Sequence, residues 1–550
     1  MNYEFCDPQN GGRKAKKPYI CPMFVKKKPN RSGSTTVTVA RKVKGKTSYL
    51  VTLGTSSDPT EIARMVSEAQ SYIRMQQGMP ELDFEGEALK RAEEEISMTD
   101  SVLSRIEYVA LDAPKRILGK VFDSIGFGDT GDDIFRSLVI ARLSFPSSKR
   151  ATVEYLKSYF EDDISLHRIY RYLDRLNDSR QEAIQATSVR HTMNVHGGRI
   201  GVLFYDVTTL YFDSDSQDEL RKPGYSKDGK HSSPQIVLGL LVSSDGCPLA
   251  YAIHEGSKYE GHTMLPVIRD FVDRYGLEEF VVVADSGMMS EANVADLEAD
   301  GIQYIIGARI RNMSPKVRQW ILAWGKNTTE IVSLDLDGVP GKRLLVGYSE
   351  KRAAMDARNR AKGLERLRKK YATGTITKSK ITQRGYNKFL RVSGNDRITV
   401  SIDETLVAED ERWDGLKGYV SNAKLADDKI VEAYHELYNV EQSFRIAKSK
   451  LEIRPMFHFN TKRIKAHVCI CFVALKVYRE LDRLLKSNNM NMSVDTVLNI
   501  AKTIPTVRVA TSGEPIIKTL FLTPRQRQLL PLFGTEFWGS QNNTGNQQVD

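Results

Sequence analysis

The sequence predicts an α/β domain with a mixed β-sheet in the middle of the chain, preceded by a small β-containing N-terminal region and a helical region. Two apolar runs, one from Arg199 onwards and one at 234–256, resemble strands, and a Ser-Asp-Gly turn interrupts the second. Helical and strand patterns then alternate up to residue 310, which is typical of βαβα units. A chain of 550 residues is long enough for roughly three or four domains.

The N-terminal elements follow from local signals. Residues 1–18 are polar and basic, so we expect a flexible arm, and short β-like runs follow it. Asp58 and Pro59 are a typical helix start. From about 95 to 195 the pattern is helical, and Ser165 is expected to cap a basic helix that exposes His167, Arg168, Arg171 and Arg175. A short helix, a turn and a basic helix are compatible with helix-turn-helix DNA binding, but a plain helical bundle explains the pattern nearly as well.

Three kinds of sequence pattern follow after residue 310: β-rich, helical and low-order. A β-rich stretch at 311–425 contains a strongly charged helix at 350–371. Two helical patterns follow, one at 431–455 and one in the apolar run that contains Cys469 and Cys471. No second cysteine pair lies near these two residues, so we interpret them as small core residues and not as metal ligands. The stretch from Gly534 to the end predicts a low-order tail.

The overall composition restricts the class of protein. Lys and Arg number 80 against 69 Asp and Glu, and the net charge of +11 suits a polyanionic partner without proving one. The N-terminus lacks the apolar segment of a signal peptide, and no uncharged apolar run approaches the roughly 18 residues that a membrane helix needs. We therefore expect a cytoplasmic protein that does not bind a membrane.

One helical segment, 431–455, carries Tyr434, Glu441 and Lys448 at intervals of seven. Seven residues are close to two turns, so these side chains would form a column with about 10 Å between neighbours. An apolar seam runs beside this column: Leu437, Val440, Phe444, Ala447 and Leu451. An ordinary amphipathic helix with solvated charges would show the same pattern.

Two aspartates upstream are candidates to share a site with Glu441. Asp206 interrupts an apolar strand, and Asp285 ends another apolar strand just before a helix. An ionised carboxylate in such a run is costly unless it is paired or bound to a metal, although either residue could be a cap or a turn residue. If both meet Glu441, three mutually repelling carboxylates would favour a hard divalent cation, Mg²⁺ in particular.

The segments around these acids resemble the DDE transposases of bacterial insertion sequences, most closely the IS-four superfamily. The resemblance runs from about 199 to 480 and rests on YDVTTLYF, VVVADSGMMSEANVADL and YHELYNVEQSFRIAKSKLEIRP. It implies a ribonuclease-H-like catalytic core, interrupted by a β-rich insertion, in which Asp206, Asp285 and Glu441 are the catalytic and metal-binding acids. It also implies two Mg²⁺ ions, with Mn²⁺ able to replace them.

The resemblance also implies DNA contacts. The superfamily's helix signature is Tyr, two residues, Arg, three residues, Glu, six residues, Lys, and this chain matches it at Tyr434, Glu441 and Lys448. Leu437 stands where the Arg is expected, and Arg445 is a candidate substitute for it. A glycine-containing basic loop near the acids is expected to meet phosphates through five residues: Arg221, Lys222, Lys227, Lys230 and His231.

The expected boundaries combine these interpretations. They are 1–60 for the arm and small β-rich region, 61–198 for a helical region expected to bind DNA, 199–310 for the first part of the core, 311–425 for the insertion, 426–490 for the second part of the core with the Glu helix, and 491–550 for a C-terminal region and tail.

The predicted function is cut-and-paste transposition in the bacterial cytoplasm. Two-metal phosphoryl transfer would cleave double-stranded DNA at the terminal inverted repeats and join the ends to target DNA, and a homodimer would bring the two ends together. Two rivals remain. One is a metal-dependent nuclease of the same fold without joining activity, and the other is a non-catalytic DNA-binding protein derived from a transposase.

Overall fold

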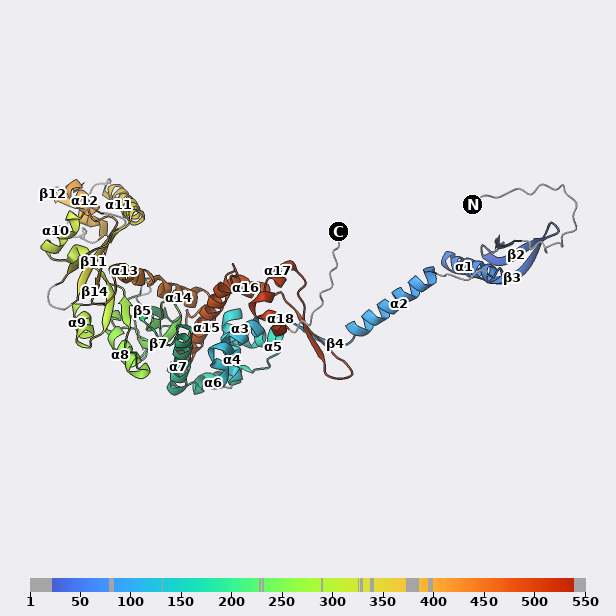
Figure 1. The fold of residues 1–550 in the computed structure, drawn as a ribbon, viewed down its shortest axis with the longest axis horizontal. Helices are drawn as coiled ribbons and strands as arrows, with labels where there is room; N and C mark the ends of the chain where they lie inside the picture. Colours follow the sequence, from blue (N-terminus) through green and yellow to red (C-terminus); the bar gives the residue numbers. More distant parts are fainter. Residues whose placement is uncertain are drawn as a thin grey trace. The chain divides into compact units, whose positions relative to one another are not determined.

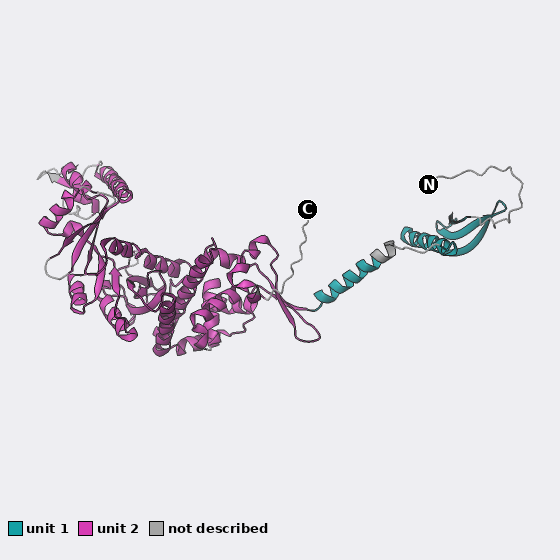
Figure 2. Ribbon diagram, viewed as in Figure 1, with its two compact units in different colours: residues 1–105 teal, residues 106–550 magenta. Residues whose placement is uncertain are grey.

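The computed structural model describes residues 22–78, 84–130, 132–226, 229, 232–287, 290–324, 326, 330–336, 341–371, 385–393 and 399–538. The chain divides into two compact units, residues 1–105 and residues 106–550, which Figure 2 shows in different colours. The predicted arm at 1–18 lies outside the described residues. Each unit is described by itself.

The first unit is an antiparallel three-stranded sheet with a helix on one face. The strands are β1 (Met23–Pro29), β2 (Thr35–Val43) and β3 (Lys46–Ser56), and the helices are α1 (Pro59–Gln76) and α2 (Phe84–Leu103). Asp58 caps α1 by accepting a bond of 2.9 Å from Thr60 N, as predicted. Met65 and Ala69 of α1 pack on Val37 and Val39 of β2. This helix therefore completes the core of the sheet, and the unit extends beyond the expected boundary at residue 60.

The second unit begins with a helical region. Its elements are β4 (Ile106–Ala110), α3 (Ala113–Ile125), α4 (Asp133–Ser144), α5 (Lys149–Phe160), α6 (Leu166–Arg175) and α7 (Asp178–Val195). Ser165 caps α6, and the predicted basic side chains of that helix are exposed. Helices α3, α4, α6 and α7 pack on α15 (Thr461–Ser487), most of which is buried, including Cys469 and Cys471. The region is a bundle around this long helix (Figure 1).

An eight-stranded mixed sheet forms the centre of the second unit. Its order is β10-β11-β14-β9-β8-β5-β6-β7, with β5 parallel to β8 and antiparallel to β6. The strands are β5 (Val202–Tyr211), β6 (Gln235–Val242), β7 (Pro248–Glu255), β8 (Val281–Ala284), β9 (Gln303–Ala308), β10 (Val332–Asp335), β11 (Arg343–Tyr348) and β14 (Leu416–Ser421). The hairpin and the βαβα alternation predicted from the sequence are both confirmed.

Three strands of the stretch expected to be a β-rich insertion, 311–425, join the central sheet. Strands β10, β11 and β14 extend the central sheet, because β14 pairs with β9 through backbone hydrogen bonds. Four further elements of this stretch form a satellite with its own small core: α11 (Glu350–Tyr371), β12 (Leu390–Ser393), β13 (Thr399–Ile402) and α12 (Glu404–Glu411).

Helices cover both faces of the sheet. On one face lie α13 (Asp427–His435), α14 (Tyr438–Ser449) and α15, whose apolar side chains share a core with Phe204 and Leu210 of β5. On the other lie α8 (Met264–Tyr275), α9 (Glu291–Ala299) and α10 (Pro315–Ala323), which share a core with Leu203 and Tyr205. Side chains alternate along a strand, so each residue of β5 can be assigned to one face.

The predicted low-order tail is wrong for residues 534–538. The C-terminal elements are α16 (Val494–Ala501), β15 (Thr506–Val509), β16 (Ile516–Thr519), α17 (Pro524–Arg527) and α18 (Gly534–Phe537), and β15 pairs with β4. Trp538 is 1% exposed and packs edge-on against Phe521 and Phe537. Burial of these aromatic rings orders a stretch whose polar composition alone suggested disorder. Residues 539–550 lie outside the described residues.

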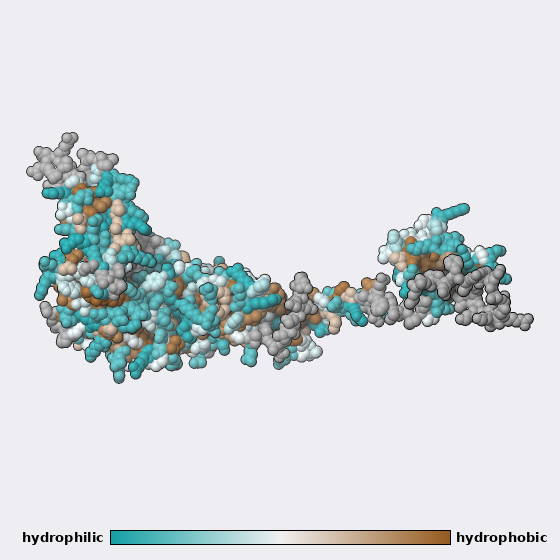
Figure 3. Space-filling view, turned by 45° about the horizontal axis from the view of Figure 1, so that its top comes forward, coloured by the Kyte–Doolittle hydropathy of each residue, from teal (hydrophilic) through white to brown (hydrophobic). Residues whose placement is uncertain are grey.

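The surface shown in Figure 3 is mainly hydrophilic, with smaller hydrophobic areas between the polar side chains. Throughout the part of the chain that the structure describes, every helix is too short or too polar to cross a lipid bilayer.

A buried basic cluster makes stability depend on pH. Burial lowers the pKa of His458 to about 3 and holds the pKa of His467 well below its usual value, and the neighbouring Lys149 and Arg142 lower both further. The unfolded chain therefore binds more protons than the folded chain as the pH falls below about 6.5, so acid favours unfolding. We expect the free energy of unfolding, measured with urea, to fall by about 3 kcal/mol from pH 7 to pH 5.

The variant His467→Gln should flatten this dependence, whereas His167→Gln, at an exposed position, should leave it unchanged. If the free energy of unfolding changed equally with pH in the two variants, His467 would not be a source of the pH dependence.

Candidate active site

Two of the predicted acids come from neighbouring strands: Asp206 lies within β5, and Asp285 directly follows β8. The parallel pairing of β5 with β8 matches Phe204 with Val283. Asp206 lies two residues further along β5, and Asp285 lies two residues after Val283, one residue past the end of β8. Continuing this register past β8 would bring the two residues to adjacent positions. Both follow the side-chain alternation of Phe204 and Val283, and they therefore point to the face covered by α13, α14 and α15.

The third acid comes from a helix on that same face. Glu441 is an exposed residue in the first turn of α14, a helix that packs against β5. Asp285, Tyr434 and Glu441 line one cleft with a volume of about 1030 Å³. The structure thus gathers Asp285 and Glu441 at one cleft, whereas Asp206 is not among the described residues that line it.

The prediction of one continuous helix over 431–455 is wrong. The segment forms α13 and α14, separated by Glu436 and Leu437. At this junction the backbone hydrogen bonds join residues three apart and not four: Leu437 N donates to Tyr434 O at 3.1 Å, and Val440 N donates to Leu437 O at 3.2 Å. Such bonds between residues three apart tighten the turn locally. Tyr434 and Glu441 consequently belong to different helices, although both reach the same cleft.

Tyr434 is a buried neighbour of Asp285. Its hydroxyl donates to Asp285 Oδ1 at 3.3 Å, and the ring is 5% exposed. Burial raises the pKa of Tyr434, and the nearby charge of Asp285 raises it further, so the phenol stays protonated and remains a donor. Gly307 on β9 makes room for it, since a Cβ there would lie 2.5 Å from the hydroxyl oxygen.

Lys417 is a basic site residue that the sequence analysis missed. It lies half-buried on β14, with its ammonium 4.5 Å from the centre of the Tyr434 ring. Desolvation lowers its pKa and Arg352 lowers it further, while Asp285 and Glu441 oppose this shift. Lys417 lines the same cleft as both carboxylates. The only local signal was a lysine inside the apolar strand LKGYV.

The donor set suits a magnesium site, whereas the side-chain orientations do not complete one. Three carboxylates from two strands and a helix are hard oxygen ligands of the kind that Mg²⁺ prefers. However, Asp206 Oδ1 accepts from Val207 N at 2.8 Å, and Asp285 Oδ1 accepts from Ser286 N at 2.8 Å. Among the residues described, no three His, Cys, Asp or Glu side chains are placed to hold one metal ion. The chemistry of the acids therefore fits the metal, and their side chains would have to rotate toward one another.

Hydrogen bonds on both sides of Glu441 fix α14. Asn439 Nδ2 donates to Ser244 O at 2.7 Å, and Ser443 Oγ donates to Gly246 O at 2.9 Å, so the helix is tied to the turn between β6 and β7. From α15, the Arg479 guanidinium donates to Ser443 Oγ at 2.7 Å and to Asn439 O at 2.9 Å.

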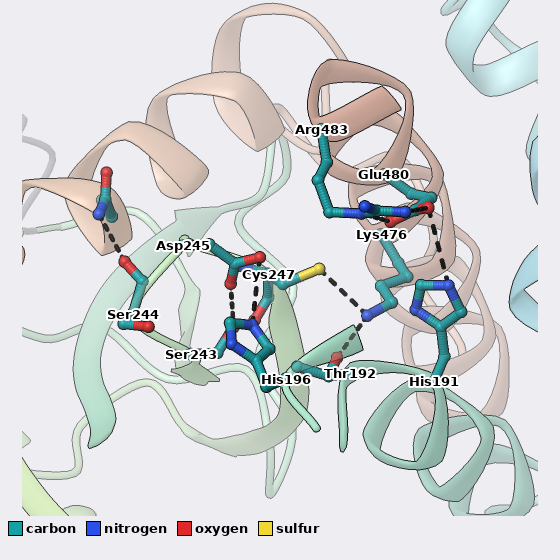
Figure 4. A network of polar contacts seen from close by, with 12 residues as sticks. His191, Thr192, His196, Ser243, Ser244, Asp245, Cys247, Lys476, Glu480 and Arg483 are labelled. Carbon is teal, nitrogen blue, oxygen red and sulfur yellow. Dashed lines mark hydrogen bonds and ion pairs between the residues drawn. The ribbon is translucent and has the colours of Figure 1, made fainter. Parts of the chain in front are cut away.

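The turn between β6 and β7 is itself held from two other elements (Figure 4). His196, at the end of α7, lies 3.4 Å from Asp245, and the buried Lys476 of α15 donates to Cys247 Sγ at 3.1 Å and to Thr192 Oγ1 at 2.5 Å. The position of Glu441 therefore depends on contacts that reach α7 and α15.

The predicted DNA-contacting residues fall into three groups. Arg445 is exposed on α14 and donates to Tyr438 Oη at 3.2 Å, and Lys448 is half-buried on the same helix. Lys227, Lys230 and His231 lie outside the described residues.

Two further residues of the basic loop are paired within the protein. Arg221 is 6% exposed and bonds to Asp218 at 2.9 Å, and Lys222 pairs with Glu255 at 2.5 Å. The expectation that Arg221 meets phosphate is therefore wrong, because its charge is buried and neutralised.

Comparison with known proteins gives a family. A family model described as a transposase DDE domain matches residues 197–476. A search of curated proteins gave no match. Among solved structures, the piggyBac transposase synaptic complex with hairpin DNA is similar at 9% identity and a TM-score of 0.36, covering 66% of this chain and 68% of that chain.

Two Mos1 structures are also similar, at 11% identity each. The Mos1 transposase paired-end complex with the left transposon end has a TM-score of 0.15 and covers 29% of this chain and 53% of that one. The Mos1 mariner paired-end complex with Mn has a TM-score of 0.14, with 29% and 54% covered.

Proposed function

Because the chain belongs to the transposase DDE domain family, we propose that it cuts DNA at the ends of an insertion sequence and joins those ends to target DNA. The observation that supports the proposal is that Asp285 and Glu441 line one cleft, on the face of the sheet to which the alternation of β5 assigns Asp206. The succession of hairpin strands and parallel strands from β5 to β9 supports a ribonuclease-H-like core.

Asp206, Asp285 and Glu441 would hold two divalent ions, Mg²⁺ or Mn²⁺. When bound, such ions supply charge stabilisation for the attacking and leaving oxygens of an in-line displacement. Tyr434 would hold Asp285 in place through its hydroxyl. Lys417, next to Asp285 and Glu441, would meet the phosphate that is cut, and its charge would reduce the repulsion between the acids.

The proposed reaction has two displacements at phosphorus. In the first, water attacks the phosphodiester at the transposon end, and the 3′-oxygen leaves as a free hydroxyl. In the second, this 3′-hydroxyl attacks a phosphodiester of the target and displaces another 3′-oxygen, so the number of phosphodiester bonds is conserved. No covalent bond between enzyme and DNA is needed.

Several further roles stay proposals. Arg445 and Lys448 would contact DNA beside Glu441, and Lys227, Lys230 and His231 would contact phosphates. A homodimer would bring two ends together, and the reaction would take place in a bacterial cytoplasm. The six expected segments would correspond to an arm, a DNA-binding region, a divided core with its insertion, and a C-terminal region.

The test uses the inverted repeats that flank the gene. Purified protein is incubated with Mg²⁺, a labelled end fragment and a supercoiled plasmid as target. We expect nicked or cut ends and a labelled plasmid product, and both should disappear when EDTA removes the metal. Cleaved ends without joined plasmid would instead identify a nuclease, and retained end binding without any cleavage would identify a non-catalytic DNA-binding protein.

A further inference from the structure

The three-stranded sheet of the first unit has an unusual charge. Every charged side chain between residues 22 and 57 is a lysine or an arginine, and the next carboxylate along the chain is Asp58 at the start of α1. A sheet with this composition has no internal acid to neutralise it, so the strands carry a strong positive field.

The two faces of this sheet differ. Val37 and Val39 of β2 point toward α1 and form the core of the unit. Alternation along β2 sends Thr36, Thr38 and Lys42 to the opposite face. We call this opposite side the basic face.

Strand pairing adds residues to the basic face. Opposite Thr36 lies Lys28, and opposite Thr38 lie Lys26 on β1 and Thr52 on β3, and paired residues of antiparallel strands share a face. Tyr49 lies opposite Ala40, and Lys26 Nζ donates to the Tyr49 hydroxyl at 2.9 Å. The basic face therefore carries lysines, threonines and Tyr49 around Phe24 and Ala40, on a sheet in which two register shifts interrupt the pairing of β2 with β3.

Thr38 is buried at the centre of this face, and several of its neighbours are available at the surface. Lys28, Lys42 and Thr52 are exposed, and Tyr49 is 52% exposed. Lysine, threonine and tyrosine are among the side chains that contact phosphate and sugar in protein–DNA complexes. A row of ammonium groups without carboxylates fits a polyanion, and strands are one of the elements that dock on DNA.

We propose that the basic face of the first unit is a DNA-binding surface, separate from the candidate active site, and that its partner is double-stranded DNA. Lys26, Lys28 and Lys42 would contact backbone phosphates, and the exposed Thr52 hydroxyl would add a hydrogen bond. This surface would give the proposed transposase a second site of contact with DNA. Binding there would not depend on the three acids or on a metal.

The chain offers a matched control for a test. Lys28 and Lys42 lie on the basic face, whereas Lys27 and Lys46 pair with Val37 and Val43 and so lie on the side of α1. All four lysines are exposed. The variants Lys28→Gln/Lys42→Gln and Lys27→Gln/Lys46→Gln therefore remove the same charge from opposite faces of one sheet.

Full-length protein is titrated with a fluorescent 30-base-pair duplex at several salt concentrations, with EDTA present so that catalysis plays no part. Each lost phosphate contact should lower the slope of log affinity against log salt by about 0.9, so Lys28→Gln/Lys42→Gln should lower it by about two and weaken binding roughly tenfold. The control variant should retain the wild-type slope. Circular dichroism and thermal unfolding establish that both variants are folded.

Equal slopes for the two variants would overturn the proposal. A larger loss with a 30-nucleotide single-stranded RNA than with the duplex would also overturn it, because RNA would then be the partner. The binding titration contains EDTA and does not depend on cleavage. A negative cleavage assay would therefore count against the proposed function alone, and equal salt slopes would count against the DNA-binding surface alone.

Discussion

Replacing Asp206 or Asp285 with Asn, or Glu441 with Gln, is expected to lower the rate of end cleavage by at least about a thousandfold. An amide keeps the size of the side chain and removes the negative charge that would hold the metal. Asp285 and Glu441 are exposed and Asp206 is half-buried, so none of the three substitutions opens a cavity in the core. Cleavage is measured on the labelled end fragment under single-turnover conditions.

Three controls accompany this measurement. Binding of the end fragment in EDTA should stay close to wild type, because DNA contacts are expected from other residues. Glu432→Gln changes an exposed acid of α13 that pairs with Lys429 and should leave the rate unchanged. Binding of Mn²⁺, measured by electron paramagnetic resonance, should be lost in the acid variants. Cleavage above a tenth of the wild-type rate in any of them would remove that acid from the site.

The central strands and the helix starts could be predicted because their signals are local. The run that forms β5 carries apolar residues on both faces and a single acid, Asp206, as expected for a buried strand between two helical layers. Ser165 and Asp58 precede helices that they cap through their own side chains. The acids could be selected for a similar reason, since a carboxylate in an apolar strand needs a partner wherever the strand lies.

The arrangement of the remaining elements could not be predicted from local patterns. Strands β11 and β14 show the same buried central residues whether they form a separate sheet or extend the main one, and only the pairing of β14 with β9 decides this. Trp538 depends on Phe521 and Phe537 for its burial. Lys417 and Arg479 acquire their roles from residues of other elements, and no spacing within the sequence records those contacts.

Arg479→Met is expected to slow cleavage by roughly a hundredfold although Arg479 touches none of the three acids in its hydrogen bonds. Arg479 is 6% exposed, and its guanidinium donates hydrogen bonds to Gln442, Ser443 and Asn439. These bonds hold α14 in place on both sides of Glu441. Methionine fills much of the same volume but donates no hydrogen bond. A displacement of α14 by about 1 Å would carry Glu441 away from the aspartates, and such misplacement typically costs about a hundredfold in rate.

A loss of stability alone would not explain the expected pattern. Unpaired groups on α14 should lower the free energy of unfolding by about 2–3 kcal/mol. If Arg479 positions Glu441, the variant should also need a higher Mg²⁺ concentration for half-maximal cleavage, and Arg479→Lys should recover part of that shift. Arg483→Met is the matched control, since Arg483 lies one turn further along α15 and pairs with Glu480. This variant should lose stability while keeping the wild-type Mg²⁺ dependence. An unchanged Mg²⁺ dependence in Arg479→Met would mean that Glu441 is held without Arg479, because a metal ligand that moves must change the affinity of the metal it binds.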